Sequence, residues 1–262
     1  GRQMGSLMVA DITQGAGLMP FDALNPRVDF VVSTSLKWLC GTPGAGILYA
    51  DKDLIPVTQV GVTPMLMTVP KTSPYATAAD LIKAGKAAPG KLNFASGGQG
   101  TVQYMAPELM NQAAGVNMLH IPYKSGGLAI TGTIAGEVDM GFFNLPAISS
   151  HVKAGTLKAL AITSAQRHPL FPEVPTVSEV IGKPYESFEW NGIFLPRGTP
   201  TDIVNRLNAA LREVLATPEI KARFDSLGSR IVASSPEDFR KYLTAESGRW
   251  AATVKAAGIK KE

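Results

Sequence analysis

The sequence has a single cysteine, Cys40, among its 262 residues, so no disulfide can form within the chain. Exported proteins without disulfides are common, and the cysteine count therefore leaves the compartment open. The chain also lacks an apolar run of about 18 residues, so no membrane-spanning helix is predicted. Residues 1–4 lack the basic segment and apolar core that begin a signal peptide, and none is expected there.

Clusters of one charge sign are missing too. The net charge is +4 at pH 7, and no group of lysines and arginines alternates with aromatic residues. A nucleic-acid surface needs such a cluster, so no nucleic-acid partner is expected. Charged residues make up 18% of the chain and hydrophobic residues 45%, which is typical of a globular protein rather than a disordered one.

Catalytic and metal-binding motifs are absent as well. The sequence contains no Gly-x-Ser-x-Gly, His-Glu-x-x-His or Cys-x-x-Cys pattern. The three histidines, His120, His151 and His168, do not have metal-ligand spacing, and His120 lies in an apolar run where a structural role is expected. We therefore predict no enzyme activity, no metal and no cofactor.

What is present is an alternation of short apolar runs with amphipathic stretches. This order predicts an α/β fold with a mainly parallel sheet, followed by a last third that is almost all helix. The proline-rich residues 169–184 are predicted as an extended connection. The predicted strands cover residues 7–10, 29–33, 47–50, 65–69, 92–95, 118–121, 138–142, 157–163 and 189–195, and the predicted helices cover 78–87, 102–114, 128–135, 148–154, 200–216 and 218–227, with a last one from Ser235.

The most informative stretch is the sequence SGGQGT, residues 96–101, between a predicted strand and a predicted helix. Glycine lets the backbone turn with positive φ and lets a ligand approach closely. The free N–H groups at a helix N-terminus attract anions. The loop lacks the Gly-Lys-Ser/Thr ending of a nucleotide P-loop, so it suits a small carboxylate better than a triphosphate. A tight turn that binds nothing is the alternative interpretation.

Two more predicted strands, 118–121 and 138–142, are each followed by a short loop and a predicted helix. The carboxyl ends of parallel strands meet at one edge of a sheet, where ligands bind. We therefore predict a binding site made of backbone N–H groups, the Ser96, Thr101 and Ser125 hydroxyls and the Asn144 amide. Three ordinary turns are the alternative.

Nine short segments from residue 55 onward carry a family resemblance by their order. They are IPVTQV (55–60), AAPGKLNF (87–94), SGGQGT (96–101), HIPYK (120–124), GEVDM (136–140), NLP (144–146), KAGTLKALA (153–161), VPTV (174–177) and AGI (257–259). With them, residues 51–262 resemble the Bug family, the periplasmic solute receptors of tripartite tricarboxylate transporters. The resemblance implies a small organic carboxylate as ligand, a membrane permease as partner, a periplasmic location and a monomer.

The resemblance also implies a two-lobed fold like that of the type II periplasmic binding proteins. The first lobe would contain residues 1–68 and 190–262, and the second lobe residues 69–189. Many family members have Asp-Asn where this chain has Phe143-Asn144, so no ion pair with a ligand amino group is expected. The residues that the resemblance places at the ligand are a turn at Thr63 and Pro64, the loop residues Ser96, Gly97, Gly98, Gly100 and Thr101, the strand end at Phe143 and Asn144, and Thr163 and Ser164.

Residues 9–50 depart from this family, whose first lobe opens with strand–helix units and a ligand loop that are missing or replaced here. The sequences DITQ (11–14) and VDFVVSTSLKWLCGTPGAGILY (28–49) instead resemble the cofactor region of class V aminotransferases. That resemblance implies Lys37 as a Schiff-base lysine for pyridoxal phosphate, with Asp11 at the pyridine nitrogen and Gln14 at the phenolic oxygen. Leu36 stands where those enzymes have histidine.

The chain therefore looks like a junction of two pieces near residue 50, and two classes of function follow. The first is a solute receptor without catalysis, whose altered first lobe is expected to weaken binding and closure. The second is a fragment of a pyridoxal-phosphate enzyme. Lys37 lacks the flanking domain and phosphate loop that such an enzyme needs, which favours the receptor. A degenerate protein that binds nothing is a third alternative.

Overall fold

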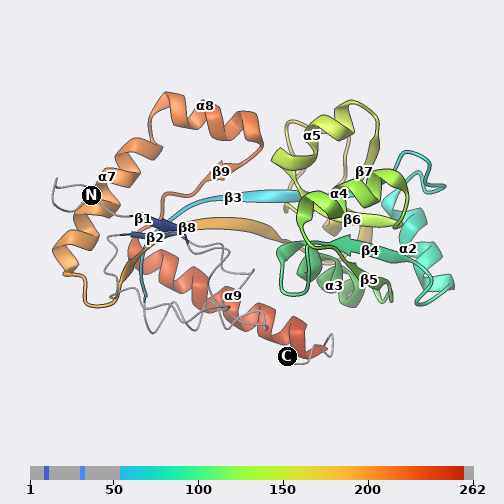
Figure 1. Cartoon of the computed structure of the whole chain (residues 1–262), viewed down its shortest axis with the longest axis horizontal. Coiled ribbons are helices and arrows are strands. Elements are labelled where there is room, and N and C mark those ends of the chain that lie inside the picture. The colour runs from blue at the N-terminus through green and yellow to red at the C-terminus, as the bar shows by residue number, and fades with distance from the viewer. Residues whose placement is uncertain (1–8, 12–29, 33–53, 257–262) are drawn as a thin grey trace. The chain divides into compact units, whose positions relative to one another are not determined.

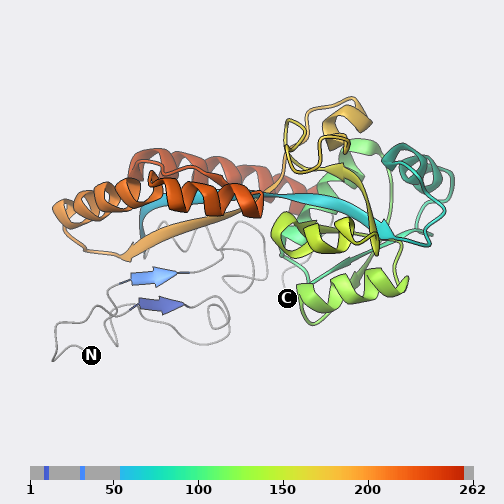
Figure 2. The ribbon, with the colours of Figure 1, turned by 90° about the horizontal axis from the view of Figure 1, so that it is seen from above.

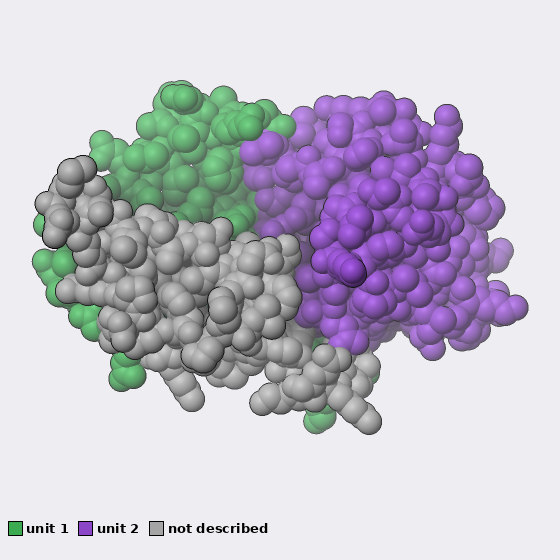
Figure 3. Space-filling model, viewed as in Figure 1, with its two compact units in different colours: residues 1–62, 190–226, 230–262 green, residues 63–189, 227–229 purple. Residues whose placement is uncertain are grey.

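The computed structural model describes residues 9–11, 30–32 and 54–256, and the chain divides into two compact units (Figures 1 and 3). Unit 1 contains residues 1–62, 190–226 and 230–262, and unit 2 contains residues 63–189 and 227–229. Two strands, β3 (Leu54–Pro70) and β8 (Phe188–Pro196), each contribute residues to both units.

The sheet of unit 2 has its described strands in the order β5-β4-β6-β3-β7. Strand β4 (Asn93–Ser96) pairs in parallel with β5 (Leu119–Pro122) and β6 (Met140–Asn144). Strand β3 is antiparallel to β6 and to β7 (Leu157–Ile162). The helices are α2 (Ala78–Ala87), α3 (Val102–Ala114), α4 (Gly126–Ala135), α5 (Leu145–Lys153) and α6 (Val177–Ile181), and the predicted α/β class is confirmed.

Helices cover both faces of this sheet. Successive residues of a strand point to opposite faces, so neighbouring residues of β4 contact different helices. The Phe94 ring contacts Tyr104 of α3, with ring centroids 6.0 Å apart. The next residue, Ala95, belongs to a core cluster on the other face that includes Ala129 of α4 and Ile148 of α5. Strand β4 is thus buried between two layers of helix, which explains its short and wholly apolar centre.

In unit 1, the short strands β1 (Val9–Asp11) and β2 (Phe30–Val32) run parallel and side by side (Figure 2). Strand β2 pairs with β8, β8 lies next to β3, and β3 pairs with β9 (Arg230–Ile231). The helices of this unit are α7 (Thr201–Leu215), α8 (Pro218–Leu227) and α9 (Pro236–Ala256). The helical last third that the sequence predicts is therefore confirmed.

An aromatic cluster holds α9 to the sheet of unit 1. The Trp190 ring meets Phe239 edge-on at 5.6 Å between centroids, and the Phe194 ring lies 5.1 Å from Phe239. A Cβ on Gly192 would lie 2.2 Å from the Phe239 ring, so only glycine fits between the strand and this side chain. Trp190 is buried in this cluster.

The strand β3 corrects one prediction. Thr63 and Pro64 were expected to form a turn, but they lie inside this strand and are buried. Gly61 and Val62 pair with β9, and pairing with β6 and β7 begins at Met65 and Leu66. Pro64 falls between the stretch that pairs with β9 and the stretch that pairs with β6 and β7, and the strand continues through it.

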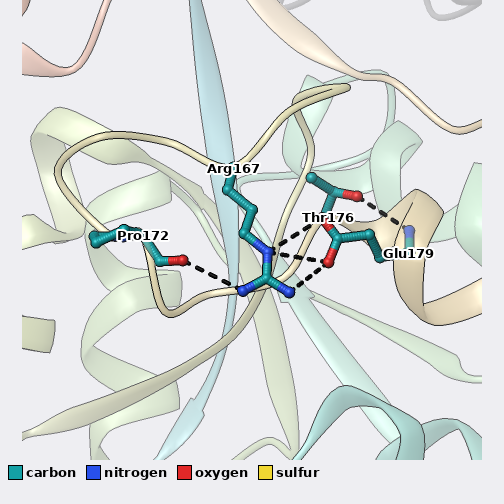
Figure 4. Close-up of polar contacts among 4 residues, drawn as sticks. All are labelled: Arg167, Pro172, Thr176 and Glu179. Carbon is teal, nitrogen blue, oxygen red and sulfur yellow. Dashed lines mark hydrogen bonds and ion pairs between the residues drawn. The ribbon is translucent and has the colours of Figure 1, made fainter.

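The proline-rich connection after β7 is also more structured than predicted, because it contains α6. Thr176 caps this helix by accepting a hydrogen bond from the N–H of Glu179. Arg167 binds the Glu179 carboxylate at 2.6 Å and donates to the Pro172 carbonyl at 3.3 Å (Figure 4). The Arg167 side chain thus links the loop at Pro172 to the helix α6.

Candidate functional site

The carboxyl edge of the unit 2 sheet brings together the three strand ends singled out by the sequence. Ser96 at the end of β4 is level with Pro122 at the end of β5, and β6 runs parallel to β4 up to Asn144. Each end leads into a helix, α3, α4 or α5. The prediction that the three ends share one edge is confirmed.

Hydrogen bonds within the loop of residues 96–101 fix its shape. Ser96 is fully buried, and its hydroxyl accepts from the Gly98 N–H at 3.0 Å. The Thr101 hydroxyl donates to the Gly98 carbonyl at 2.8 Å. Gly98 and Gly100 have φ values of +119° and +78°, which glycine adopts without strain. The Ser96 and Thr101 hydroxyls therefore hold the loop in its shape.

His120 of β5 contacts the first residue of this loop. Its Nε2 lies 2.7 Å from the Ser96 hydroxyl, and its ring packs 4.5 Å from Tyr104 and 5.2 Å from Phe94 between centroids. Burial lowers the pKa of His120 to about 4, so the ring is neutral near pH 7 and adds no positive charge. The predicted structural role of this histidine is confirmed.

Gln103 on the first turn of α3 is a site residue that the sequence analysis missed. Its side-chain oxygen Oε1 accepts a hydrogen bond from the Gly97 N–H at 3.0 Å. Its amide also lies against Gly126, the first residue of α4, because a Cβ there would be 2.7 Å from Nε2. A polar residue in the first turn of a helix is common, so nothing in the sequence marks this one out.

The three helices at this edge have uncompensated N-termini. None of α3, α4 and α5 has an acidic residue in its first turn, whereas the other described helices α2, α6, α7, α8 and α9 each have at least one. Ser125 caps α4 through the Leu128 N–H, but Thr101 and Asn144 make no side-chain cap. The edge thus presents free N–H groups and positive helix dipoles, which together favour an anion.

Asn144 adds an unusual polar atom to this edge. Its Oδ1 is buried and has no hydrogen-bond partner among the described residues. The preceding residue, Phe143, is fully buried in the hydrophobic core of unit 2. Phe143 can therefore offer a ligand only its backbone groups. Its side chain does not take the place of the aspartate that many family members have here.

The other predicted site residues have hydroxyls that are already bonded within unit 2. The Thr63 hydroxyl lies 2.8 Å from that of Ser229. Thr163 donates to the Ser187 carbonyl and accepts from the Met65 N–H. Ser164 donates to the Gln166 carbonyl at 2.7 Å. These bonds show a local structural role for each hydroxyl.

The described residues include neither a candidate metal cluster nor a membrane-spanning helix. They contain no group of three or more His, Cys, Asp or Glu that could hold a metal ion. No described helix is long and apolar enough to cross a membrane. Of the residues that resemble the aminotransferase site, Asp11 ends β1, whereas Gln14 and Lys37 lie outside the described residues, as does the predicted strand at 47–50.

Comparison with known families gives two matches. The first covers residues 44–259 and is the tripartite tricarboxylate transporter family receptor. The second covers residues 1–80 and is aminotransferase class V. Both resemblances drawn from the sequence thus recur, the first over most of the chain and the second over its beginning.

Individual relatives agree with the longer match. Protein BugT of Bordetella pertussis is 34% identical over 210 residues, which are 80% of this chain and 64% of that protein. The chain spans about three fifths of the length of the curated relatives it matches.

Solved structures show the same likeness. Rpa4515 of R. palustris with adipate has a TM-score of 0.78 and 28% identity, over 87% of this chain and 77% of that one. MatC of Rhodopseudomonas palustris with bound malate has a TM-score of 0.68 and 28% identity, over 77% and 69%. These likenesses confirm the predicted fold of the type II binding-protein kind.

Proposed function

The chain belongs to the tripartite tricarboxylate transporter receptor family, and on that premise we propose that it is a periplasmic receptor for a small organic carboxylate. It would deliver this solute to the membrane permease of a tripartite transporter, act as a monomer and catalyse no reaction. Its relatives with bound adipate and malate support a carboxylate as the ligand class.

The observation that carries the proposal is the set of three uncompensated helix N-termini at one sheet edge. The ligand carboxylate would accept hydrogen bonds from backbone N–H groups in the first turns of α3, α4 and α5. These hydrogen bonds would be strong, because the carboxylate is charged and lies at the positive end of each helix dipole. The proposed lining is Ser96, Gly97, Gly98, Gly100, Thr101, Phe143 and Asn144, with Thr63, Pro64, Thr163 and Ser164 nearby.

The proposal includes two lobes that both contact the ligand. The first lobe contains residues 1–68 and 190–262, and the second contains residues 69–189. The two compact units, which have similar bounds, support it. The replaced opening of the first lobe is expected to weaken affinity. Losing two charge-assisted hydrogen bonds of about 1.5–3 kcal/mol each corresponds to roughly 10²–10⁴-fold.

A thermal-shift screen over mono-, di- and tricarboxylates, including adipate and malate, tests the proposal, with calorimetry on any compound that stabilises the chain. Malate and aspartate form a matched pair, because they differ by a hydroxyl in place of an ammonium group. No described residue of the proposed lining has an acidic side chain, so malate should bind more tightly. A chain that none of these compounds stabilises would rule out the receptor.

A second candidate is a pyridoxal-phosphate enzyme fragment with Lys37 as the Schiff-base lysine. The match of residues 1–80 to class V aminotransferases favours it. Such a site would give the protein an absorption band that depends on Lys37 and remains after unbound cofactor is removed, which the receptor would lack.

A further inference from the structure

We propose that Gln103 contacts the bound solute directly, with its side-chain Nε2 donating a hydrogen bond to the ligand carboxylate. This inference rests on the proposed function and names one specificity-determining side chain of that same site. It adds a neutral donor to a site otherwise formed by backbone groups.

The orientation of the Gln103 amide is fixed by Gly97. The Gly97 N–H can only donate, so the atom that faces it at 3.0 Å must be the oxygen Oε1. The two N–H bonds of Nε2 then point away from Gly97. No acceptor for Nε2 is present among the described residues, so this donor is available at the carboxyl edge.

The position of the amide places that donor between two helix N-termini. Gln103 itself lies in the first turn of α3, and its amide rests on Gly126, the first residue of α4. A Cβ on Gly126 would lie 2.7 Å from Nε2 and 3.0 Å from Oε1. Glycine at 126 therefore makes room for the amide, and both helix dipoles favour an anion at this point.

The close fit of Gly97 completes the arrangement. A Cβ on Gly97 would lie 2.8 Å from the backbone nitrogen of Gly126, so the loop after β4 and the start of α4 approach each other closely. Gln103 is held between them but remains partly exposed. A partly exposed donor with a fixed orientation can reach a ligand without first being released from another bond.

The substitution Gln103→Glu separates a ligand contact from a structural role. Glutamate has the same shape and keeps an acceptor for the Gly97 N–H, but it replaces the donor with a negatively charged oxygen. We expect the folded chain to keep its thermal stability and to lose carboxylate affinity by roughly 10-fold or more. The matched control is Gln112→Glu, which makes the same change at an exposed position on the same helix and should stay within about twofold of the unaltered chain.

Calorimetry with adipate and malate is the measurement. Equal affinity in Gln103→Glu and in the unaltered chain would overturn the inference and leave the proposed receptor standing. Failure of the unaltered chain to bind any carboxylate would overturn both.

A second measurement avoids substitution altogether. The side-chain ¹⁵N–H₂ signals of Gln103 in the unaltered protein should shift when adipate or malate saturates the site. Signals that stay in place at saturation would overturn the inference, even if Gln103→Glu were to unfold.

Discussion

Gly97 and Gly126 both exclude a side chain, but the atoms that exclude it differ. A Cβ on Gly126 would meet the far end of the Gln103 side chain, whereas a Cβ on Gly97 would meet backbone. A flexible side chain can move away at little cost, and a backbone atom cannot. The two glycines should therefore respond differently to the same substitution.

We expect Gly126→Ala to keep or slightly raise the thermal stability, since alanine favours a helix over glycine by about 1 kcal/mol. It should nevertheless lower carboxylate affinity by displacing the Gln103 amide. Gly97→Ala should lose stability by about 1–3 kcal/mol, because the loop must move. Denaturant unfolding and calorimetry on both variants check this, and equal stability losses would contradict it.

The half-buried His120 gives a prediction on pH. Its pKa is about 4 in the folded chain, against an ordinary value of 6.5. As the pH falls from about 6.5 to 4, the unfolded chain takes up a proton that the folded histidine does not. The contribution of His120 to the free energy of unfolding is therefore fully present above pH 6.5 and is lost on the way down to pH 4.

His120→Gln removes this titration. Its free energy of unfolding should fall less steeply between pH 6.5 and 4 than that of the unaltered chain, when both are measured by denaturant titration. Parallel curves for the two proteins would show that His120 titrates normally.

At the scale of the element, the first turn of α4 has no acidic residue, so a substitution there can raise helix stability while it weakens anion binding. Gly127 is the second residue of α4 and is exposed, and a Cβ there would make only an ordinary contact, 3.9 Å from the Ser125 hydroxyl oxygen. Gly127→Gln should stabilise the helix by about 0.5–1 kcal/mol. Gly127→Glu should add about 0.3–1 kcal/mol through the helix dipole.

The same glutamate should weaken carboxylate binding by about two- to fivefold, since it neutralises the dipole that attracts the ligand. Gly127→Gln controls for the loss of glycine and should bind like the unaltered chain. Thermal unfolding and calorimetry on this pair check both effects, and tighter binding by the glutamate variant would refute the electrostatic account.

Helix bounds could be predicted from the sequence where local caps mark them. The bounds of α2, α3 and α8 agree with the predicted ones. Local signals mark such bounds: the Thr77–Asp80 capping box begins α2, and the left-handed Gly115 ends α3. Residues 54–64 of β3 were missed, since they are mostly buried without alternation and include Pro56 and Pro64. Only pairing partners distant in the sequence hold these residues in a strand.

In the candidate site too, some features follow from the local sequence and others depend on tertiary contacts. Positive φ at Gly98 and Gly100 follows from the glycine-rich sequence itself. The role of Gln103 depends on Gly97 and Gly126, which a tertiary contact brings to it. The core position of the Phe143 ring likewise depends on which face of β6 the sheet buries, which the residue's own sequence neighbours do not show.

At the scale of the whole molecule, the two family matches make opposing predictions about added pyridoxal phosphate. A receptor should show no absorption band that depends on Lys37, because the aminotransferase match covers only residues 1–80. We expect the visible spectra of the unaltered chain and of Lys37→Ala with the cofactor to be the same. A band lost specifically in Lys37→Ala would support the enzyme fragment.

The membership of β3 in both units has a consequence for how the nascent chain folds. Nearly all of unit 2 is one continuous stretch, residues 63–189, whereas the unit 1 half of β3 needs β8 and β9, which are synthesised later. Unit 2 can therefore form on the ribosome while Val57 and its neighbours still lack their cover. A chain stopped before β8 would carry nearly all of unit 2 together with the first part of β3, which would lack its β8 and β9 partners and could template aggregation.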